Sequence, residues 1–449
     1  MGRITLSQAA QWCGGRVDPK YAEVTFLGAN NDSRKIKPGQ LFLALAGIRD
    51  GHDFIPMALE KGAAAVLCTH CDGDYPAIVV EDVRIALGQI AAGERQRIGM
   101  KVVGVTGSVG KSTTKEMISC VLGAAYRVAK TPENHNNDIG MPMAVLSIPE
   151  DTEVAVLEMG MNHFREIAYL TNIAKPDLAV IINIGTMHIE HLGSQEGILK
   201  AKLEIAEGME PNASLILNGD DAYLRKAPSM VNNPITYFGT GENAALRAEE
   251  IRDEDGISYQ VSCGDDRFGI WLPVEGLHHV PDSLAAVAVG MQMGVEPEGI
   301  AKALAGFRNM EGRQEIFEAR GCTIIKDCYN AGPESMAAAL AVLGKRQGRK
   351  IAVLGDMLEL GVSTQAEHYR IGRIAAENAN ILLTYGPNGP RTVSGAVTGG
   401  MTNVHAFEDH GKLAEELKRI VRTGDTLLFK GSHGMHMEIA LELFLKNET

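Results

Sequence analysis

The sequence predicts an α/β protein of three domains, in which mostly parallel sheets are flanked by helices. At 449 residues, the chain is long enough for two or three domains of about 150 residues, each with its own core. Short apolar runs alternate with helix-length amphipathic segments from end to end, which is typical of βαβ units. Runs such as Leu178–Ile182 are apolar on both faces, as a strand covered on both sides requires.

The predicted strands are short apolar runs that alternate with the predicted helices. They are Leu41–Leu45, Ala64–Cys68, Ala77–Val80, Val102–Thr106, Val154–Glu158, Leu178–Asn183, Ile351–Gly355 and Thr426–Phe429. Apolar residues spaced i, i+3 and i+4 predict helices over Lys115–Leu122, Gly197–Ala206 and Ala366–Ala376. The irregular stretch Asn243–Val274 interrupts this alternation and predicts a small antiparallel edge on the central sheet.

Three domains follow from this order of elements. Residues 1–99 form a smaller N-terminal α/β domain that ends near the helical segment Gly93–Gly99. Residues 100–310 form a central domain that opens with the strand from Lys101. Residues 311–449 form a Rossmann-like C-terminal domain that opens at Glu311. The sequence contains no internal repeat and no low-complexity linker.

The composition excludes several classes of function. Lys and Arg total 43 against 56 Asp and Glu, which gives a formal net charge of −13. Nucleic-acid binding draws on a basic surface, so no nucleic-acid partner is expected. Aromatic residues are only 5% of the chain, too few for a platform that stacks single-stranded bases. A phosphate-bearing ligand must therefore be held locally, by backbone N–H groups, a few basic side chains and metal.

The sequence also predicts a cytoplasmic location. The N-terminus becomes polar from Ser7 onward and lacks an apolar core of signal-peptide length. No run approaches about 18 apolar residues, so no membrane insertion is expected. The seven cysteines are scattered, which fits reduced thiols. Cys68 and Cys71 form one CxxC pair, which cannot fill a tetrahedral zinc site alone; metal or redox use is the lesser alternative to two thiols at a strand end.

The strongest motif is a phosphate-binding loop between a buried strand and a helix, in the run Val102–Lys115. Its glycines let the backbone curl so that successive N–H groups point inward at the helix N-terminus. Lys111 is placed to reach the terminal phosphates, and the Ser112 hydroxyl can ligate Mg²⁺. Val105 occupies the first glycine position of the strict P-loop pattern, so the loop is a compact variant. The predicted ATP-binding residues here are Gly107, Ser108, Val109, Gly110, Lys111, Ser112 and Thr113.

The ends of two further predicted strands are expected at the same edge of the sheet as the phosphate-binding loop. Glu158 ends one predicted strand, where a carboxylate can hold Mg²⁺ against the phosphates. The strand Leu178–Asn183 leads to His188 and His191. Each residue alone could be an ordinary helix cap. Polar residues at the ends of two successive strands after a P-loop, however, indicate a nucleotide-dependent site.

These motifs resemble the Mur ligases, the ATP-dependent amide-forming enzymes of peptidoglycan synthesis. The resemblance covers nearly the whole chain. It rests on the segments Asn31–Arg34, Pro38–Leu45, Asp50–Phe54, Thr106–Thr114, Asn134–Pro142, Gly197–Ile205, Gly312–Glu315 and Lys326–Ser335. Within the family, Ala352–Gly361 with His368, and Lys430–Glu438, are similar to the members that add D-alanyl-D-alanine to UDP-N-acetylmuramoyl-tripeptide.

The resemblance implies roles for particular residues. Ser33 and Arg34 would meet the UDP end of the substrate. The residues that it places in the chemistry are Lys111, Glu158, His188 and Lys202. Ser112, Glu158, His188 and Lys202 would hold two Mg²⁺ ions, with Lys202 carbamylated by CO₂ so that its side chain becomes an oxygen donor. Arg313, Asp327 and Asn330 would face the ATP.

The implied reaction joins two small-molecule substrates, and a monomeric enzyme is expected. The γ-phosphoryl group of ATP passes to the C-terminal carboxylate of the UDP-linked tripeptide, and the amine of D-alanyl-D-alanine attacks the acyl phosphate. Lys111 and the metal ions would offset the repulsion between the anionic partners. Closure of the three domains would exclude water, which would otherwise hydrolyse the acyl phosphate.

The chain departs from the family pattern at several positions. His279 and Asp282 stand where relatives have paired asparagines near the adenine. Gly332 replaces a polar residue, and His433 and His436 stand where arginines are common. Imidazole is only partly charged near neutral pH, so how the carboxylate of the dipeptide is held stays open.

Three alternatives remain at this point. The first is a sister ligase that adds a diamino acid to a muramoyl-dipeptide, or glutamate to folate. The second is a non-catalytic P-loop nucleotide sensor, and the third is a cell-wall scaffold with a decayed site. The identity of the third residue of the acceptor peptide is also left open.

Overall fold

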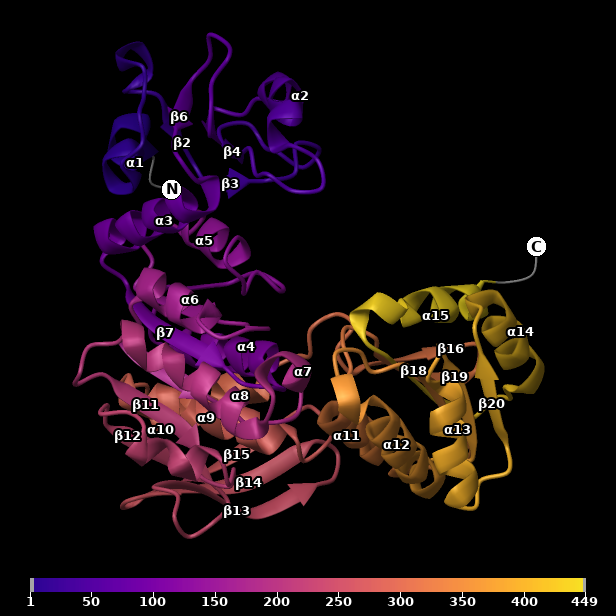
Figure 1. Ribbon diagram of the computed structural model, residues 1–449. Coiled ribbons are helices and arrows are strands. Elements are labelled where there is room, and N and C mark those ends of the chain that lie inside the picture. Colours follow the sequence, from indigo (N-terminus) through magenta and orange to yellow (C-terminus); the bar gives the residue numbers. More distant parts are fainter. Residues whose placement is uncertain (1–3, 447–449) are drawn as a thin grey trace.

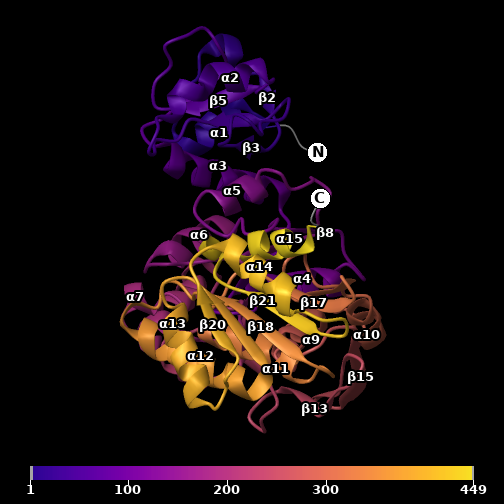
Figure 2. The same ribbon diagram turned by 90° about the vertical axis from the view of Figure 1, so that its right-hand side faces the viewer.

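The computed structural model describes residues 4–446 and shows three α/β units (Figure 1). The N-terminal unit stands on the central unit, and the C-terminal unit lies against another side of the central unit (Figure 1). Turned by 90°, the C-terminal sheet lies in front of the central unit, below the N-terminal unit (Figure 2). The predicted α/β class, with parallel sheets flanked by helices, is confirmed.

The N-terminal unit contains a small parallel sheet. Its strands, in spatial order, are β3 (Ala29–Asn30), β4 (Leu41–Leu43), β5 (Ala65–Cys68) and β6 (Ala77–Val79). A separate antiparallel pair is formed by β1 (Ile4–Thr5) and β2 (Thr25–Phe26). The helices are α1 (Leu6–Cys13), α2 (Ile55–Glu60) and α3 (Val83–Ile98).

The central sheet has nine strands among the described residues. In spatial order they are β15 (Asp266–Leu272), β14 (Ile257–Cys263), β13 (Leu246–Asp253), β12 (Ile235–Gly239), β11 (Ser214–Asn218), β10 (Leu178–Ile181), β7 (Lys101–Thr106), β9 (Val154–Glu158) and β8 (Val128–Lys130). The strands from β8 to β13 pair in parallel, whereas β13, β14 and β15 pair antiparallel. The antiparallel edge predicted within Asn243–Val274 is therefore present.

The helices of the central unit cover both faces of this sheet and carry most of its connections. They are α4 (Lys111–Leu122), α5 (Gly140–Val145), α6 (Glu166–Ala174), α7 (Ile189–Leu192), α8 (Gln195–Leu203), α9 (His279–Gln292) and α10 (Pro297–Ala305). Helix α4 begins at Lys111, earlier than the predicted Lys115, because the apolar pattern does not register the polar first turn. Helix α8 ends at Leu203, earlier than the predicted Ala206, and a 3₁₀ turn follows. At that point the Glu204 carboxylate accepts from the N–H groups of Arg165 and Ala168 at the start of α6.

The C-terminal sheet has six strands among the described residues. Their order is β16 (Glu315–Ala319), β17 (Cys322–Asp327), β21 (Thr426–Lys430), β18 (Lys350–Gly355), β19 (Ile381–Tyr385) and β20 (Val404–Phe407). The helices are α11 (Pro333–Gly344), α12 (Thr364–Asn378), α13 (Gly389–Thr398), α14 (His410–Ile420) and α15 (Met437–Leu445). Strand β21 returns between β17 and β18, which opens a crevice at the carboxyl ends of the strands.

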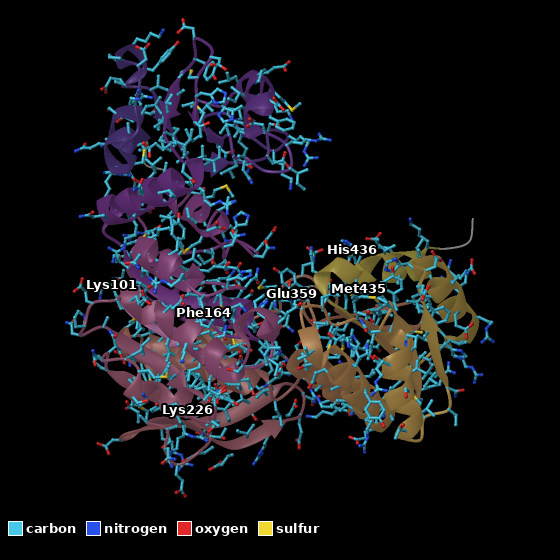
Figure 3. All side chains as sticks on the ribbon, viewed as in Figure 1. Lys101, Phe164, Lys226, Glu359, Met435 and His436 are labelled. Carbon is cyan, nitrogen blue, oxygen red and sulfur yellow. The ribbon has the colours of Figure 1, made fainter. Side chains whose placement is uncertain are left out.

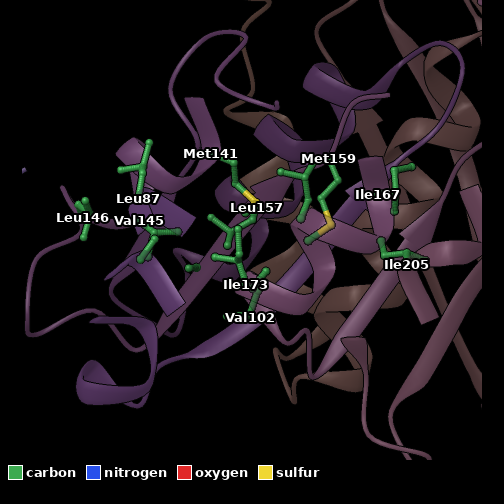
Figure 4. Close-up of a cluster of buried hydrophobic side chains, with 14 of the residues drawn as sticks. Leu87, Val102, Met141, Val145, Leu146, Leu157, Met159, Ile167, Ile173 and Ile205 are labelled. Atoms are coloured by element: carbon green, nitrogen blue, oxygen red, sulfur yellow. The ribbon is translucent and has the colours of Figure 1, made fainter. Parts of the chain in front are cut away.

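One hydrophobic core runs from the N-terminal unit into the central unit. Leu87 on α3, Val145 on α5 and Ile173 on α6 pack towards Leu157 of the central sheet (Figure 4). Asp82 caps α3, and Gly99 ends it with a φ of +70°. The predicted boundary at residue 99 thus lies between a buried helix and a buried strand, which ties the two units together.

No helix within residues 4–446 is long and apolar enough to cross a membrane. The expected lack of a signal peptide rests partly on Met1, Gly2 and Arg3, which lie outside the described residues. The last residues of the predicted C-terminal domain, from Asn447 onward, also lie outside them.

Candidate nucleotide-binding site

The phosphate loop joins β7 to α4 at the carboxyl edge of the central sheet. Gly110 has a φ of +86°, and a Cβ there would lie 2.4 Å from Oδ1 of Asp282, so only glycine fits. The backbone N–H groups of Ser108 and Val109 donate to Oδ1 of Asn183 at 3.0 and 2.9 Å. Asn183, which follows the neighbouring strand β10, therefore holds the curl of the loop.

Lys111 folds back over the loop. Its Nζ donates to the carbonyl oxygens of Gly107 at 2.8 Å and Ser108 at 3.2 Å. Burial lowers the pKa of Lys111, the Glu158 carboxylate raises it in part, and Arg313 lowers it further. A phosphate bound in the loop would place a negative charge beside the Lys111 ammonium and so stabilise its charged form.

Ser112 and Glu158 bring two oxygen donors together. Ser112 Oγ donates to Glu158 Oε2 at 2.8 Å. The other carboxylate oxygen accepts from Asn136 Nδ2 at 2.7 Å, and the Glu158 N–H donates to Thr131 Oγ1 at 3.0 Å. Glu158 is buried, so its orientation is fixed by these contacts. A hydroxyl and a carboxylate at the phosphate loop are ligands that fit Mg²⁺.

The C-terminal unit supplies an arginine to the same place. Arg313 Nη2 donates to Ser112 Oγ at 2.9 Å, and its guanidinium carbon lies 3.9 Å from the ring centroid of Tyr329. Within residues 4–446 the buried Arg313 Nε has no hydrogen-bond partner. The structure thus places Arg313 where an anionic ligand on the P-loop would meet it.

Asp327 and Asn330 lie beside Arg313 in a network around Lys430. Lys430 Nζ donates to Asp327 Oδ2 at 2.7 Å and to the Asn330 carbonyl at 2.9 Å. Asp327 Oδ1 also accepts from the Gln314 N–H at 3.3 Å. Lys430 is buried, so this ion pair fixes the end of β21 against the end of β17.

His188 and Lys202 lie near the P-loop, close enough for the charge of Lys111 to affect the pKa of each. Burial, together with the nearby charges of Lys111 and Lys202, lowers the pKa of His188 to about 3, so the imidazole is neutral at physiological pH. Lys202 on α8 is 2% exposed, and within residues 4–446 no hydrogen-bond acceptor offsets the burial of its side chain. Burial, followed by the charge of Lys111, lowers the pKa of Lys202 well below its usual value. Both shifts favour the neutral form of the side chain more than water does.

A cavity of about 470 Å³ lies between the central and C-terminal units. It is lined by the phosphate loop, Glu158 and His188 from the central unit, and by Arg313, Asp327 and Asn330 from the C-terminal unit. Lys202 is not among the residues that line it.

Two carboxylates of the C-terminal unit reach the loop that follows β10. Glu334 Oε1 accepts from the N–H and the hydroxyl of Thr186, at 3.1 and 3.0 Å. Glu359 Oε2 lies 2.8 Å from Nδ1 of His188, and Figure 3 shows Glu359 on the flank that faces the central unit. The two units therefore meet at the site.

The unusual residues His279 and Asp282 belong to a buried network. Asp282 Oδ1 accepts from the Thr114 hydroxyl at 3.0 Å, and Asp282 Oδ2 lies 3.5 Å from His279 Nδ1. His279 Nε2 lies 3.2 Å from Gln314 Oε1, and Gln314 Nε2 donates to the Glu275 carbonyl. Because the Gln314 amide nitrogen is already donating, His279 is the donor to Oε1. The two residues thus join the P-loop helix to the segment that carries Arg313.

The other positions at which the chain departs from the family pattern are Gly332, His433 and His436, and each has different surroundings. Gly332 precedes α11, and a Cβ there would lie 2.9 Å from Cγ of Met187, so the small residue permits a close approach. His433 lines the cavity, whereas His436 is an exposed partner of Glu438. Of the two histidines, His433 is therefore the one positioned to meet a ligand in this cavity.

Ser33 and Arg34 lie in the N-terminal unit and do not line this cavity. Ser33 is buried, with Oγ 3.4 Å from Sδ of Met57. The Arg34 side chain is 80% exposed and makes two 2.9 Å hydrogen bonds to Asp32. Their predicted role in UDP binding therefore stays a prediction.

Cys68 and Cys71 are separate thiols, and all seven cysteines are free. Burial raises the pKa of Cys68 to about 12. Among residues 4–446, no three His, Cys, Asp or Glu side chains are arranged to hold a metal ion.

Sequence reasoning missed several residues of this site. Asn183, Tyr329 and Lys430 lie within the recognised segments, but the motifs there predict no role for them. A polar residue at the end of an otherwise apolar strand was a usable signal for Asn183 and Lys430. Nothing local distinguishes Tyr329, because its role is to stack under an arginine that reaches the P-loop.

The fold and the site together define a multidomain P-loop enzyme, in which a second α/β unit faces the nucleotide-binding loop of the first. Family models for the Mur ligase family catalytic domain, the Mur ligase middle domain and the Mur ligase glutamate ligase domain match residues 23–95, 105–290 and 312–433.

Curated relatives match over the whole chain. A UDP-N-acetylmuramoyl-tripeptide–D-alanyl-D-alanine ligase of Bacillus subtilis is 40% identical over 450 residues, which cover 98% of this chain and 97% of the relative. The Escherichia coli ligase of the same name is 33% identical, with 99% of each chain covered. The chain belongs to the Mur ligase family.

Solved structures agree with this assignment. MurF from Acinetobacter baumannii superposes with a TM-score of 0.92 at 32% identity, covering 99% of this chain and 100% of that chain. The MurF ligase from Thermotoga maritima in complex with ADP gives a TM-score of 0.82 at 30% identity, covering 93% and 97%.

Proposed function

We propose that this protein is an ATP-dependent ligase that adds D-alanyl-D-alanine to UDP-N-acetylmuramoyl-tripeptide in peptidoglycan precursor synthesis. The observation that carries the proposal is the contact of Arg313 with Ser112, which closes the C-terminal unit over the P-loop. Full-length similarity to ligases of that name supports the choice of substrates.

The reaction has two steps. The γ-phosphoryl group of ATP is transferred to the terminal carboxylate of the tripeptide, which gives an acyl phosphate and ADP. The amine of D-alanyl-D-alanine then attacks the acyl carbon, the amine loses a proton, and phosphate leaves as the amide forms. Lys111 and Arg313 lie where they offset the repulsion between the two anionic reactants, so their contribution is positioning and charge.

Ser112 and Glu158 would hold one Mg²⁺ ion, since their oxygens converge beside the P-loop. Mg²⁺ usually takes few protein ligands and completes its shell with phosphate and water. This small number of protein ligands agrees with the lack of a larger acidic cluster within residues 4–446. When bound, the ion neutralises charge that develops on the transferring phosphoryl group.

His188 and a carbamylated Lys202 would hold a second ion. The neutral imidazole of His188 is the form that binds metal. The lowered pKa of Lys202 favours its neutral amine, the form that adds CO₂ and releases a proton. The resulting carbamate replaces a cation with an anionic oxygen donor.

The proposal assigns a role to each domain. Residues 1–99 bind the UDP end of the acceptor through Ser33 and Arg34, and residues 100–310 bind ATP. Residues 311–449 close over the ATP and bind the incoming dipeptide. The proposal includes a monomeric enzyme in the cytoplasm. The seven unpaired thiols support that location.

The test is phosphate release from the purified full-length protein with ATP, Mg²⁺, bicarbonate, UDP-N-acetylmuramoyl-tripeptide and D-alanyl-D-alanine, with each component omitted in turn. We expect release only when both the tripeptide and the dipeptide are present. Exchange of the third residue of the tripeptide would then define the preferred acceptor.

Other outcomes identify the alternatives. Release with a muramoyl-dipeptide and a free amino acid would assign the protein to a sister ligase. ATP binding without any acceptor-dependent release would indicate a nucleotide sensor or an inactive scaffold.

A further inference from the structure

Lys115 is a fully buried lysine, at 0% exposure, that no step of the proposed reaction uses. It lies one helical turn after Lys111 on α4, so the two side chains start from the same face of the helix. A buried ammonium is costly unless acceptors surround it. The acceptors that it selects therefore indicate what the residue does.

The acceptors of Lys115 belong mainly to one turn. Its Nζ donates to the Thr131 carbonyl at 2.7 Å and to the Glu133 carbonyl at 3.4 Å. Two carboxylates complete the surroundings, Glu116 at 3.3 Å and Glu158 at 4.0 Å. The two carbonyls lie in the segment Thr131–Asn136, which follows β8.

That segment holds Glu158 at two points. Thr131 Oγ1 accepts from the Glu158 N–H at 3.0 Å, and Asn136 Nδ2 donates to Glu158 Oε1 at 2.7 Å. Between these contacts, Glu133 has a φ of +40°, a conformation that a side-chain-bearing residue adopts only when its surroundings enforce it. Lys115 bonds to the carbonyl of this strained residue. The lysine thus supports the turn that orients the carboxylate.

We propose that Lys115 is a positioning residue for metal binding: it fixes the Thr131–Asn136 turn and, through that turn, the Glu158 carboxylate. The inference rests on the proposed function, which makes Glu158 a ligand of Mg²⁺. Mg²⁺ demands near-octahedral geometry, and loss of a residue that orients a ligand typically weakens metal binding by about 10–100-fold.

A purely electrostatic role would have the opposite sign. An ammonium 4.0 Å from Glu158 repels a divalent cation, so its removal would tighten metal binding if the turn stayed in place. The direction of the change therefore distinguishes positioning from charge.

The experiment compares the full-length variants Lys115→Met and Lys130→Met with the wild type. Lys130 is the matched control, because it pairs with the same Glu116 from the surface and, within residues 4–446, makes no ion pair with Glu158 and no side-chain hydrogen bond to the turn carbonyls. Binding of Mn²⁺ to the ADP complex is measured by electron paramagnetic resonance, and ADP binding in excess EDTA by calorimetry. We expect Lys115→Met to weaken Mn²⁺ binding about 10–100-fold, with a change in metal-free ADP affinity below about twofold. Lys130→Met should match the wild type in both.

Unchanged or tighter Mn²⁺ binding in Lys115→Met would overturn the proposal. An equal loss of metal-free ADP affinity would do the same, since it would show general damage to the P-loop.

Asn136→Ala provides a second test if Lys115→Met does not fold, because it removes the contact of the turn with Glu158 but keeps the buried lysine. Normal Mn²⁺ binding in Asn136→Ala would also contradict the proposal. Failure of the proposed function can be told apart from failure of the Lys115 inference. In the former case the wild-type ADP complex itself would not bind Mn²⁺.

Discussion

Lys111 and Lys202 illustrate how burial changes the chemistry of a lysine. Desolvation lowers the pKa of both, but Lys111 bonds to two loop carbonyls, whereas the Lys202 side chain has no hydrogen bond within residues 4–446. An ammonium with acceptors keeps its proton more readily than one without. Lys111 is thus suited to binding phosphate, and Lys202 to reacting as a free amine.

Substitution of Lys202 tests the carbamate. We expect Lys202→Ala to lose most turnover, because it removes the oxygen donor, while Lys202→Glu retains some by supplying a carboxylate. The measurement is the acceptor-dependent phosphate release with and without bicarbonate. Lys200 on the same helix is exposed, so Lys200→Ala is the matched control. Wild-type rates in Lys202→Ala would eliminate the carbamate role.

The Asp32–Arg34 pair has a defined dependence on pH. The hydrogen bonds from Arg34 lower the pKa of Asp32 to about 2. A depressed folded-state pKa stabilises the fold above the unfolded value of about 4, and this contribution is lost as the pH falls from about 4 to 2. Because Arg34 is exposed, solvent screens the pair and its contribution to stability is small.

The corresponding variant is Arg34→Ala. We expect the pKa of Asp32 to rise towards its ordinary value, so that at pH 4 the carboxyl is largely ionised in the wild type and about half protonated in the variant. The ¹³Cγ chemical shift of Asp32 between pH 6 and pH 4 measures this. Identical titration in both proteins would show that Arg34 does not hold the carboxylate in solution.

At the scale of elements, the phosphate loop shows how two segments fix a third. The strand β7 and helix α4 determine where the loop begins and ends, but its curl depends on Asn183 and on the close approach of Asp282. The N-terminus of α4 carries no side-chain cap, which leaves its N–H groups free to bind an anion. A side chain at Gly110 would therefore disturb both the curl of the loop and the N–H groups that can bind an anion.

Gly110→Ala tests that dependence. A Cβ at this position would combine an unfavourable φ of +86° with a 2.4 Å approach to Asp282, so we expect the loop to shift and ATP affinity to fall at least about tenfold. Calorimetric titration with a non-hydrolysable ATP analogue measures the loss. Gly99→Ala is the control, because Gly99 has a φ of +70° but a Cβ added there would meet no atom within 4 Å. A similar loss in both variants would assign the effect to stability rather than to the loop.

At the scale of the whole molecule, the three units differ in how they are joined. The N-terminal and central units share a continuous hydrophobic core, whereas the C-terminal unit meets the central unit through polar contacts around a cavity. Polar, cavity-lined interfaces between domains usually permit relative motion. We therefore expect the C-terminal unit to move when nucleotide binds.

Glu334→Ala removes one of the polar contacts that join these units. Its two hydrogen bonds to Thr186 are worth about 1 kcal/mol each, so we expect the closed-to-open equilibrium constant to fall about fivefold or more and the KM for ATP to rise. Small-angle scattering should show a larger radius of gyration without nucleotide. Glu311→Ala is the control, since Glu311 lies in the same unit but is exposed. An unchanged radius and KM would show that this contact does not set the closure.

Much of the fold follows from the sequence, because its signals are local. The strand Val154–Glu158 coincides with β9, and the antiparallel edge was detected where alternation stopped. Helix ends were less accurate, as at Lys111 and Leu203, because end positions depend on caps and on neighbours that apolar spacing does not record.

The sequence by itself determined the α/β class, the P-loop and the resemblance to the family, since each depends on residues that lie close together along the chain. The tertiary structure alone decided that Arg313 reaches Ser112, that Lys202 and Lys115 are buried, and that Asn183 holds the loop. Burial and pairing arise from contacts between elements far apart in sequence, and the pKa of a side chain depends on those surroundings. A lysine on a helix has the same local sequence signal whether it faces solvent or a metal site, so only the folded chain distinguishes the two.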